Sequence, residues 1–242
     1  MAVLARGRVE GEGAFAAEWL FTDREGGAST GDYAAFNLGG SVGDDPQAVA
    51  TNRAHVASLL DADALALVRQ VHGRDVARLD APATTPPDAD AVITDVVGLP
   101  VAVQTADCVP ILLADLVGGQ VAAVHAGWRG VVADVVGEAL AALAAPGPVQ
   151  AWVGPAICPG CYEVSEEVRD EVVAVVPEAS AFTRSGTPAV DVRAGVLAQL
   201  ARRGVTGELV GGCTYEDPHL YSFRRAPVTG RQVGAIVLRA RA

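Results

Sequence analysis

Two short apolar runs on either side of a Gly-Gly pair constrain the fold of this chain more than any other feature of its sequence. The runs span residues 109–114 and 121–124, and the pair between them is Gly118-Gly119. Apolar runs of this length around two glycines are typical of an antiparallel β-hairpin that is buried on at least one face. In such a hairpin, the residues before the first strand and after the second lie at the same edge of the sheet.

Four side chains of different chemistry are therefore expected at this edge. They are a carboxylate, a thiol, an imidazole and a guanidinium, contributed by Asp107, Cys108, His125 and Arg129. A strict two-residue turn would pair residue 117 with residue 120 and leave Cys108 and His125 out of register. We therefore expect irregular segments beyond the strands to build the site. A buried cysteine, a core-edge histidine and a surface arginine would give the same pattern without chemistry, because cysteine is often only a small hydrophobe.

Composition and charge exclude several classes of function. The formal net charge of −11 argues against a nucleic-acid partner. All 18 basic residues are arginine, which excludes a Schiff-base lysine and a P-loop lysine, so arginine or backbone N–H groups must hold any anionic substrate. No stretch is typical of a signal peptide, and no apolar run is long enough to span a bilayer. We therefore expect a cytoplasmic protein with reduced cysteines and no membrane partner, whose oligomeric state the sequence leaves open.

Hydrophobic periodicity predicts one α+β domain over residues 1–242, with helices that cover mixed sheets. Helices are expected at residues 45–60, 131–144, 165–176 and 191–204. Strands beyond the hairpin are expected at residues 14–20, 65–70, 76–79, 90–94, 101–104, 150–153, 205–210 and 233–238. The glycine-rich segment 21–43 carries interspersed large apolar side chains, so we expect an ordered loop there.

Two groups of residues suggest a metal site. The Cys158 and Cys161 pair resembles half of a structural zinc site, but no second pair follows, and Cys213 is a single thiol in another predicted loop. His72, Cys108 and His125 form the more economical set, since each lies at a strand end or beside a small residue. Three protein ligands with an open fourth position are typical of catalytic zinc.

The same Cys/His₂ set also occurs at blue copper sites. A copper oxidase additionally needs a second, imidazole-rich cluster, and only His55 and His219 remain once one site has used two histidines. The sequence therefore favours Zn²⁺ as the cofactor, although Cu²⁺ could occupy the site in vitro, since its affinity for such ligands exceeds that of zinc.

Several motifs together resemble the laccase-domain, or polyphenol-oxidase, family. They are V-H-G at 71–73, D-A-D-A-V-I-T at 88–94, T-A-D-C-V-P-I-L-L-A-D at 105–115, H-A-G-W-R-G at 125–130, C-Y-E-V at 161–164, C-T-Y-E-D-P at 213–218 and T-G-R-Q at 229–232. The resemblance covers residues 21–238. It implies stacked α/β/β/α layers, a relationship to cysteine hydrolases, and metal ligands at His72, Cys108 and His125. The chain departs from the usual motif by its extra Cys158 and by His219.

The resemblance further implies a zinc-dependent purine nucleoside phosphorylase that takes adenosine, inosine, guanosine and methylthioadenosine and also deaminates adenosine. Such an enzyme must clamp phosphate and protonate the departing base. Arg53 and Arg129 are the candidate clamps, Asp107 beside Cys108 is the candidate proton carrier, and Asn37 and Gln70 are candidates for substrate hydrogen bonds. Asp107 could equally cap local N–H groups, and Gln70 could support His72.

Three other functions remain open at this point. A copper-dependent polyphenol oxidase would use the same three ligands. A cysteine hydrolase acting on peptidoglycan precursors would use Cys108 or Cys161 as its nucleophile. A non-catalytic protein would use zinc only to brace its loops.

Overall fold

The computed structural model describes residues 3–241, which fold into five α-helices and thirteen strands. The helices are α1 (Pro46–Leu59), α2 (Trp128–Val132), α3 (Val135–Leu143), α4 (Glu166–Val175) and α5 (Val192–Ala201). The first strands are β1 (Val3–Glu10), β2 (Phe15–Thr22), β3 (Ala66–Leu67), β4 (Val76–Arg78), β5 (Ala91–Thr94), β6 (Val101–Thr105) and β7 (Val109–Asp115). The remaining strands are β8 (Gln120–Ala126), β9 (Val149–Val153), β10 (Ser180–Phe182), β11 (Pro188–Val190), β12 (Gly207–Leu209) and β13 (Gln232–Ala240).

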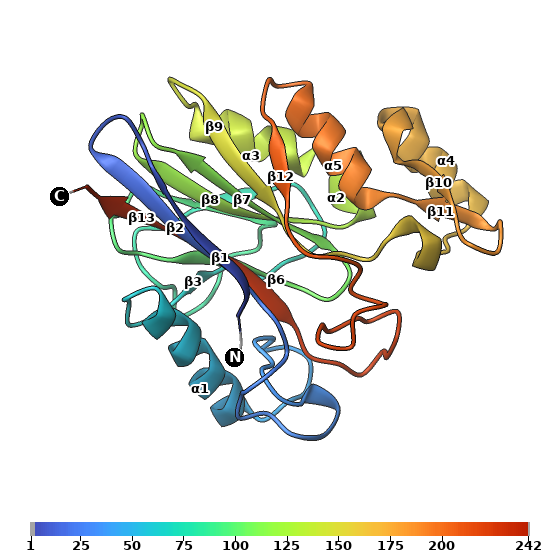
Figure 1. Ribbon diagram of the computed structural model, residues 1–242, viewed down its shortest axis with the longest axis horizontal. Coiled ribbons are helices and arrows are strands. Elements are labelled where there is room, and N and C mark those ends of the chain that lie inside the picture. The colour runs from blue at the N-terminus through green and yellow to red at the C-terminus, as the bar shows by residue number, and fades with distance from the viewer. Residues whose placement is uncertain (1–2, 242) are drawn as a thin grey trace.

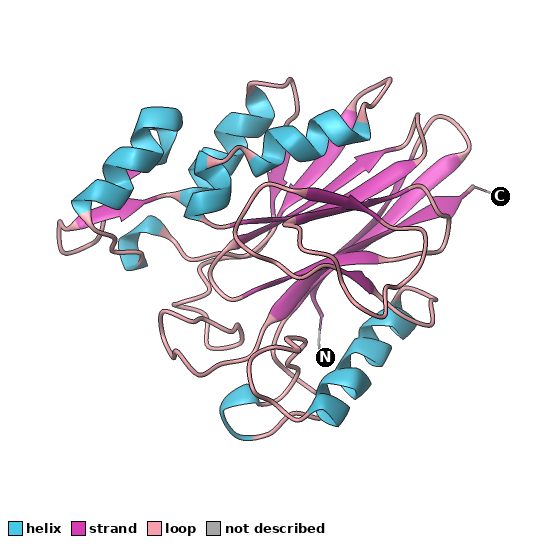
Figure 2. Ribbon diagram, turned by 180° about the vertical axis from the view of Figure 1, so that it is seen from behind, coloured by secondary structure: helices cyan, strands magenta, loops and turns pink. Residues whose placement is uncertain are grey.

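These elements form four layers (Figures 1 and 2). A five-stranded sheet has the order β1-β2-β13-β6-β3, and a six-stranded sheet has the order β12-β9-β7-β8-β5-β4. Helix α1 packs on the outer face of the five-stranded sheet, whereas α2, α3 and α5 cover the outer face of the other (Figure 1). This arrangement confirms the predicted α+β fold and its α/β/β/α layers.

Alternating side chains along the strands fill the three interfaces between these layers. On β7, Ile111 and Leu113 pack under the helices, while Leu112 points to the core between the two sheets. Successive side chains of a strand point to opposite faces, so a strand buried on both faces reads as a continuous apolar run. The two runs that flank the glycine pair therefore lie at the centre of the six-stranded sheet.

The hairpin itself has a different register from the one that a two-residue turn would impose. Asp115 pairs with Gln120 and Val109 pairs with Ala126, so four residues, 116–119, form the turn. His125 consequently lies within β8, opposite Pro110, rather than in an irregular segment beyond the strand. Cys108 lies immediately before β7, at the same edge of the sheet.

Three other expectations need correction. The helix expected over 131–144 is split into α2 and α3 at Asp134, which has a left-handed φ of 61°. Strand β1 forms a hairpin with β2, although the sequence indicated a strand only at 14–20. The short β10–β11 hairpin was not expected at all. By contrast, segment 21–43 is ordered as predicted, with Phe36 and Leu38 buried.

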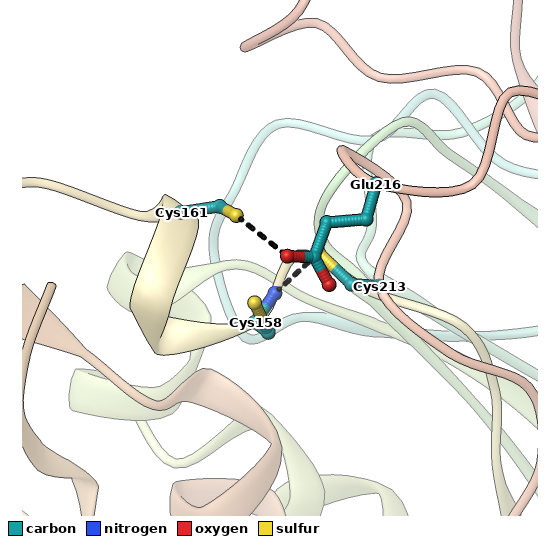
Figure 3. Close-up of side chains that lie close together, drawn as sticks. All are labelled: Cys158, Cys161, Cys213 and Glu216. Atoms are coloured by element: carbon teal, nitrogen blue, oxygen red, sulfur yellow. Dashed lines mark hydrogen bonds between the residues drawn. The ribbon is translucent and has the colours of Figure 1, made fainter. Parts of the chain in front are cut away.

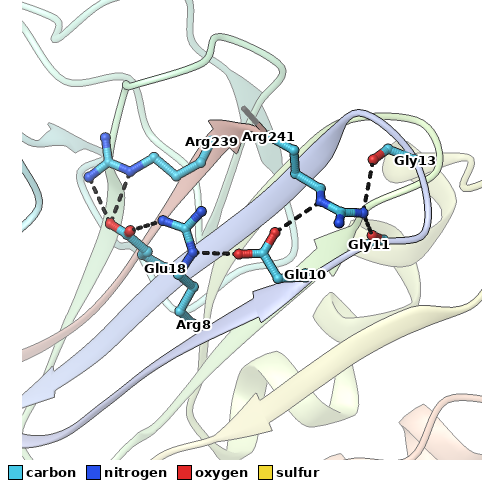
Figure 4. Close-up of polar contacts among 7 residues, drawn as sticks. All are labelled: Arg8, Glu10, Gly11, Gly13, Glu18, Arg239 and Arg241. Carbon is cyan, nitrogen blue, oxygen red and sulfur yellow. Dashed lines mark hydrogen bonds and ion pairs between the residues drawn. The ribbon is translucent and has the colours of Figure 1, made fainter.

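Charged side chains link the neighbouring strands β1, β2 and β13 on the five-stranded sheet (Figure 4). The Glu18 carboxylate accepts hydrogen bonds from Arg8 at 2.6 Å and from Arg239 at 2.8 and 2.9 Å. Glu10 pairs with Arg8 and with Arg241 near the chain's C-terminal end (Figure 4).

Within the described residues, no helix has the length and apolar character needed to cross a membrane.

Candidate metal centre

His72, Cys108 and His125 come together at the edge of the six-stranded sheet. Their ligand atoms all lie within 4.8 Å of one another, and the Sγ atom of Cys108 lies 3.9 Å from Nε2 of His72. The two imidazole rings are nearly perpendicular, at 87°, with centroids 4.9 Å apart. His125 is buried, Cys108 is partly buried and His72 is exposed, so the group is open to solvent on the His72 side.

Asp90, which directly precedes β5, holds both histidines in place. Its Oδ1 atom lies 2.8 Å from Nδ1 of His125 and accepts the His72 backbone N–H at 3.0 Å. Its Oδ2 atom accepts the backbone N–H groups of Val71, at 3.2 Å, and Gly73, at 2.6 Å. Asp90 is fully buried, and these four hydrogen bonds satisfy both oxygens of its carboxylate.

The backbone around the group leaves room for the three side chains. A Cβ atom on Gly127 would lie 3.1 Å from Sγ of Cys108 and 3.2 Å from Cδ2 of His72, so only glycine fits without displacing them. His72 and Asp107 have φ values of 60° and 96°, which are uncommon outside glycine. Backbone strain of this kind concentrates at functional sites.

The thiol and the imidazoles shift one another's protonation. Burial alone would raise the pKa of Cys108, but His125 and His72 outweigh it and lower that pKa. Burial would likewise lower the pKa of His125, but the Cys108 thiolate and the Asp90 carboxylate raise it. Without a metal ion, the pair therefore favours a thiolate beside a charged imidazole. Thiolate is the form of cysteine that binds metals and attacks electrophiles.

The donor set fits a zinc ion. Two imidazoles and one thiolate leave a fourth position open, as catalytic zinc sites require. With Nδ1 of His125 donating to Asp90, its Nε2 lone pair is free for a metal, and this carboxylate–histidine arrangement is typical of zinc ligands.

Asp107, the predicted proton carrier, has its carboxylate bound by two protein donors. Thr214 donates its hydroxyl to Oδ1 at 2.6 Å, and the backbone N–H of Arg224 donates to Oδ2 at 2.7 Å. The two partners lie 107 and 117 residues away in the sequence, so the carboxylate joins distant loops instead of capping the local N–H groups that the sequence offered as the alternative.

The two candidate phosphate clamps have different surroundings. Arg129 is exposed at the start of α2, three residues after the end of β8, and its guanidinium stacks on the Trp128 ring at 4.4 Å. Arg53 on α1 is partly buried and donates Nε to the Leu38 carbonyl at 2.9 Å. Burial lowers the pKa of Arg53. Arg129 therefore lies on the same loop edge as the metal group, whereas Arg53 supports segment 21–43.

The amide side chains of Asn37 and Gln70 bond to the chain itself. Asn37 is buried, and its Oδ1 accepts the N–H groups of Gly39 and Arg231, both at 2.8 Å. Its Nδ2 donates to Asp44 at 2.9 Å. Gln70 bonds both the N–H and the carbonyl of Gln104, at 2.8 and 2.7 Å, and so ties the corner before His72 to β6.

Four further residues act on this centre and were not expected from the sequence: Asp90, Tyr162, Arg224 and Arg231. Asp90 holds the histidines, as described above. Arg224 stacks over Tyr162 at 4.9 Å, and the thiolate of Cys108 contributes to the raised pKa of Tyr162, after burial as the main cause. Burial lowers the pKa of Arg231, and the negative charges of Cys108 and Asp107 act in the opposite direction. The motifs around Asp90 and Tyr162 were visible in the sequence, but nothing local linked their side chains to Cys108.

A family model described as multi-copper polyphenol oxidoreductase laccase matches residues 18–239. The chain belongs to this family. Two Streptomyces relatives, both named purine nucleoside phosphorylase, support the assignment. The S. griseus protein is 49% identical over 232 residues, covering 92% of this chain and 94% of the relative. The S. coelicolor protein is 51% identical over 231 residues, covering 92% of this chain and 96% of the relative.

Solved structures of similar proteins show the same fold. A Neisseria meningitidis protein superposes with a TM-score of 0.83 at 36% identity, covering 93% of this chain and 95% of the other. The Geobacillus stearothermophilus protein YlmD also gives 0.83, at 30% identity, covering 95% and 98%. The resemblance inferred from the sequence motifs, and the fold that it implied, are thereby confirmed for this member of the laccase family.

Proposed function

We propose that this chain is a zinc-dependent purine nucleoside phosphorylase with accompanying adenosine deaminase activity. The observation that carries the proposal is the His72, Cys108 and His125 group in a chain whose Streptomyces relatives, 49% and 51% identical, bear that name. The substrates would be phosphate and the purine nucleosides adenosine, inosine, guanosine and methylthioadenosine.

In phosphorolysis, a phosphate oxygen attacks C1′ of the ribose, and the bond from C1′ to the purine nitrogen breaks. The products are ribose-1-phosphate and the free base. Positive charge develops on the ribose and negative charge on the departing purine, so the protein must offset both. Zinc, when bound by the three ligands, would supply a Lewis acid beside the reacting groups.

Arg129 is the residue that we assign to phosphate. It is exposed at the start of α2, four residues after His125, and stacking on Trp128 fixes the plane of its donors. A planar guanidinium can offer phosphate two parallel hydrogen bonds. Arg53 would then act indirectly, by holding segment 21–43 through the Leu38 carbonyl.

Asp107 is assigned a positioning role. Its Oδ1 accepts the Thr214 hydroxyl and its Oδ2 accepts the Arg224 backbone N–H, so both oxygens are engaged by the chain itself rather than by a substrate. These bonds instead tie the 210–231 loop to the residue that precedes Cys108. Asn37 and Gln70 likewise position loops, because their amides are bonded to the chain.

One observation favours a second candidate, a cysteine hydrolase. Cys108, His125 and Asp90 are arranged as a thiol, a base and a carboxylate that orients the base, as in hydrolases with a nucleophilic cysteine. The presence of His72 at 3.9 Å from the same sulfur favours metal binding, because a hydrolase needs only one imidazole there. Iodoacetamide separates the two: bound zinc should protect Cys108, whereas a free nucleophile should be alkylated whether or not zinc is added.

The positions of the two other histidines argue against a copper oxidase, which needs a second cluster of imidazoles. His55 packs edge-on against Phe36, and His219 pairs with Glu25 on the surface. Among residues 3–241, neither belongs to a group of side chains able to hold a second metal.

The proposal is tested by incubating zinc-loaded protein with adenosine in the presence and absence of phosphate and identifying the products. We expect adenine and ribose-1-phosphate only when phosphate is present, together with some inosine in both cases. Free ribose formed without phosphate would instead indicate a hydrolytic nucleosidase.

A further inference from the structure

Three cysteines and one glutamate converge about a second centre, formed by two loops of the chain (Figure 3). Cys158 and Cys161 lie in the loop between β9 and α4, and Cys213 and Glu216 lie in the loop after β12. The ligand atoms of all four lie within 4.8 Å of one another. Figure 3 shows their side chains pointing toward a common point. The single thiol that the sequence placed in another loop thus joins the C-x-x-C pair.

Hydrogen bonds already orient the sulfur atoms. The backbone N–H of Cys158 donates to Sγ of Cys213 at 3.2 Å, and Cys161 lies 3.6 Å from a Glu216 oxygen. Arg184 donates to Sγ of Cys161 at 3.4 Å and forms an ion pair with Glu216. Burial and the neighbouring thiols nevertheless raise the pKa of Cys158 and of Cys161, the latter to about 12, so without a metal ion these two thiols stay protonated and a binding cation must displace their protons.

We propose that Cys158, Cys161, Cys213 and Glu216 bind a structural zinc ion, separate from the His72, Cys108 and His125 centre. Four protein ligands close the coordination shell, as structural zinc requires, and three thiolates select zinc over the hard cations magnesium and calcium. Ligand atoms about 2.0–2.3 Å from a tetrahedral zinc lie about 3.5 Å apart, so the observed group needs only a small contraction to bind it. On binding, the thiol protons pass to solvent.

The surrounding charges suit this ion. Three thiolates and a carboxylate would repel one another without a cation between them. With zinc bound, the site still carries excess negative charge, and Arg184, which already contacts both Cys161 and Glu216, offsets part of it. An arginine that bonds two of the ligands from outside has the position of the supporting residues found around metal sites.

The zinc would brace the loop that supports the candidate catalytic centre. Backbone hydrogen bonds run from Ala156 to Gly212 at 3.3 Å and from Thr214 to Ala156 at 3.1 Å, so the two loops are already paired. Thr214, next to Cys213, donates to the Asp107 carboxylate beside Cys108. A metal crosslink between residues 158–161 and 213–216 would therefore fix the loop that holds Asp107.

The test counts metal ions in protein purified under reducing conditions and then saturated with zinc. We expect two tightly bound zinc ions per wild-type chain by native mass spectrometry. Cys108→Ala should retain one, Cys158→Ser should retain one, and the double variant should retain none. Glu216→Gln should weaken binding of one ion by at least tenfold, whereas the matched exposed variant Glu171→Gln should change nothing.

A spectroscopic measurement that leaves the second cluster intact covers the case in which Cys158→Ser fails to fold. In the Cys108→Ala background, all remaining thiols belong to the second cluster, so cobalt bound there should give strong sulfur-to-metal charge-transfer bands. X-ray absorption of the zinc form should show three sulfur atoms at about 2.3 Å. The proposal is overturned if wild-type protein binds a single zinc that is lost in Cys108→Ala, or if Cys158 and Cys161 form a disulfide under the same reducing conditions.

Discussion

The clearest test of how the metal centre is built is the substitution Asp90→Asn. It keeps the size of the side chain but replaces one oxygen by an NH₂ group. Each Asp90 oxygen accepts two hydrogen bonds, one pair from His125 and His72 and the other from Val71 and Gly73. Whichever way the amide turns, two of these four donors therefore lose their acceptor.

The magnitude follows from these contacts. Hydrogen bonds to a charged group contribute about 1.5–3 kcal/mol each, so the loss of two predicts about 3–6 kcal/mol of destabilisation. Loss of a carboxylate that orients a ligating histidine typically weakens metal binding about 10–100-fold, or about 1.4–2.8 kcal/mol. We therefore expect Asp90→Asn to lower both the zinc affinity of the centre and the free energy of unfolding.

The assay is competition with a chromophoric zinc chelator, together with urea unfolding of the metal-free protein. Asp88→Asn is the matched control, because Asp88 lies two residues earlier in the same D-A-D sequence but is half exposed and paired with Arg69. An Asp90→Asn protein with zinc affinity within twofold of wild type would refute the role assigned to Asp90.

Three further predictions concern other parts of the molecule. Gly127→Ala should reduce zinc affinity about tenfold in the same chelator assay, because its Cβ would crowd Cys108 and His72. The control Gly13→Ala, whose Cβ meets no atom within 4 Å, should leave zinc affinity unchanged. Equal affinities of the two variants would contradict the packing argument. Arg129→Lys should lower the rate of phosphorolysis far more than the rate of deamination in steady-state product assays. The control is Arg69→Lys, at another exposed arginine. Equal loss of both activities would indicate a structural role for Arg129. Burial raises the pKa of Glu18, but the bonds from Arg239 and Arg8 outweigh it and lower that pKa. The ionised carboxylate therefore contributes its full stabilisation above the ordinary glutamate pKa of about 4.3, and this contribution is lost as the pH falls through the lowered value. Glu18→Gln should accordingly cost about 1 kcal/mol at pH 7 in urea unfolding and progressively less in acid, and a gap that is independent of pH would contradict the ion-pair assignment.

The sequence was sufficient to predict that the three candidate ligands come together, because they are rare residue types placed near strand ends. His72, Cys108 and His125 stand out against apolar and glycine-rich surroundings, and the Gly118-Gly119 turn brings two of them to one edge. Asp90 could not be recognised in the same way. It precedes a short apolar strand, and its four partners come from the 71–73 corner and from β8, which only the folded sheet brings together.

The remaining differences also have local causes. The apolar stripe of α2 and α3 continues across Asp134, so periodicity does not reveal the left-handed residue that separates the two helices. Strand β1 carries alternating charges on an edge, where Arg8 and Glu10 pair with each other and resemble a solvated loop in the sequence. Cys213 lies 55 residues from Cys158, and no sequence spacing indicates that their loops pair.

The central claim is that the His72, Cys108 and His125 centre performs zinc-dependent nucleoside chemistry rather than copper-dependent oxidation. The most direct measurement loads metal-free protein with one metal or the other. Each form is given adenosine with phosphate and, separately, a phenol in an oxygen electrode. We expect the zinc form to release ribose-1-phosphate and adenine without oxygen uptake, and the copper form to oxidise phenols only weakly. Rapid oxygen uptake by the copper form, together with a zinc form that cleaves no nucleoside, would contradict the account.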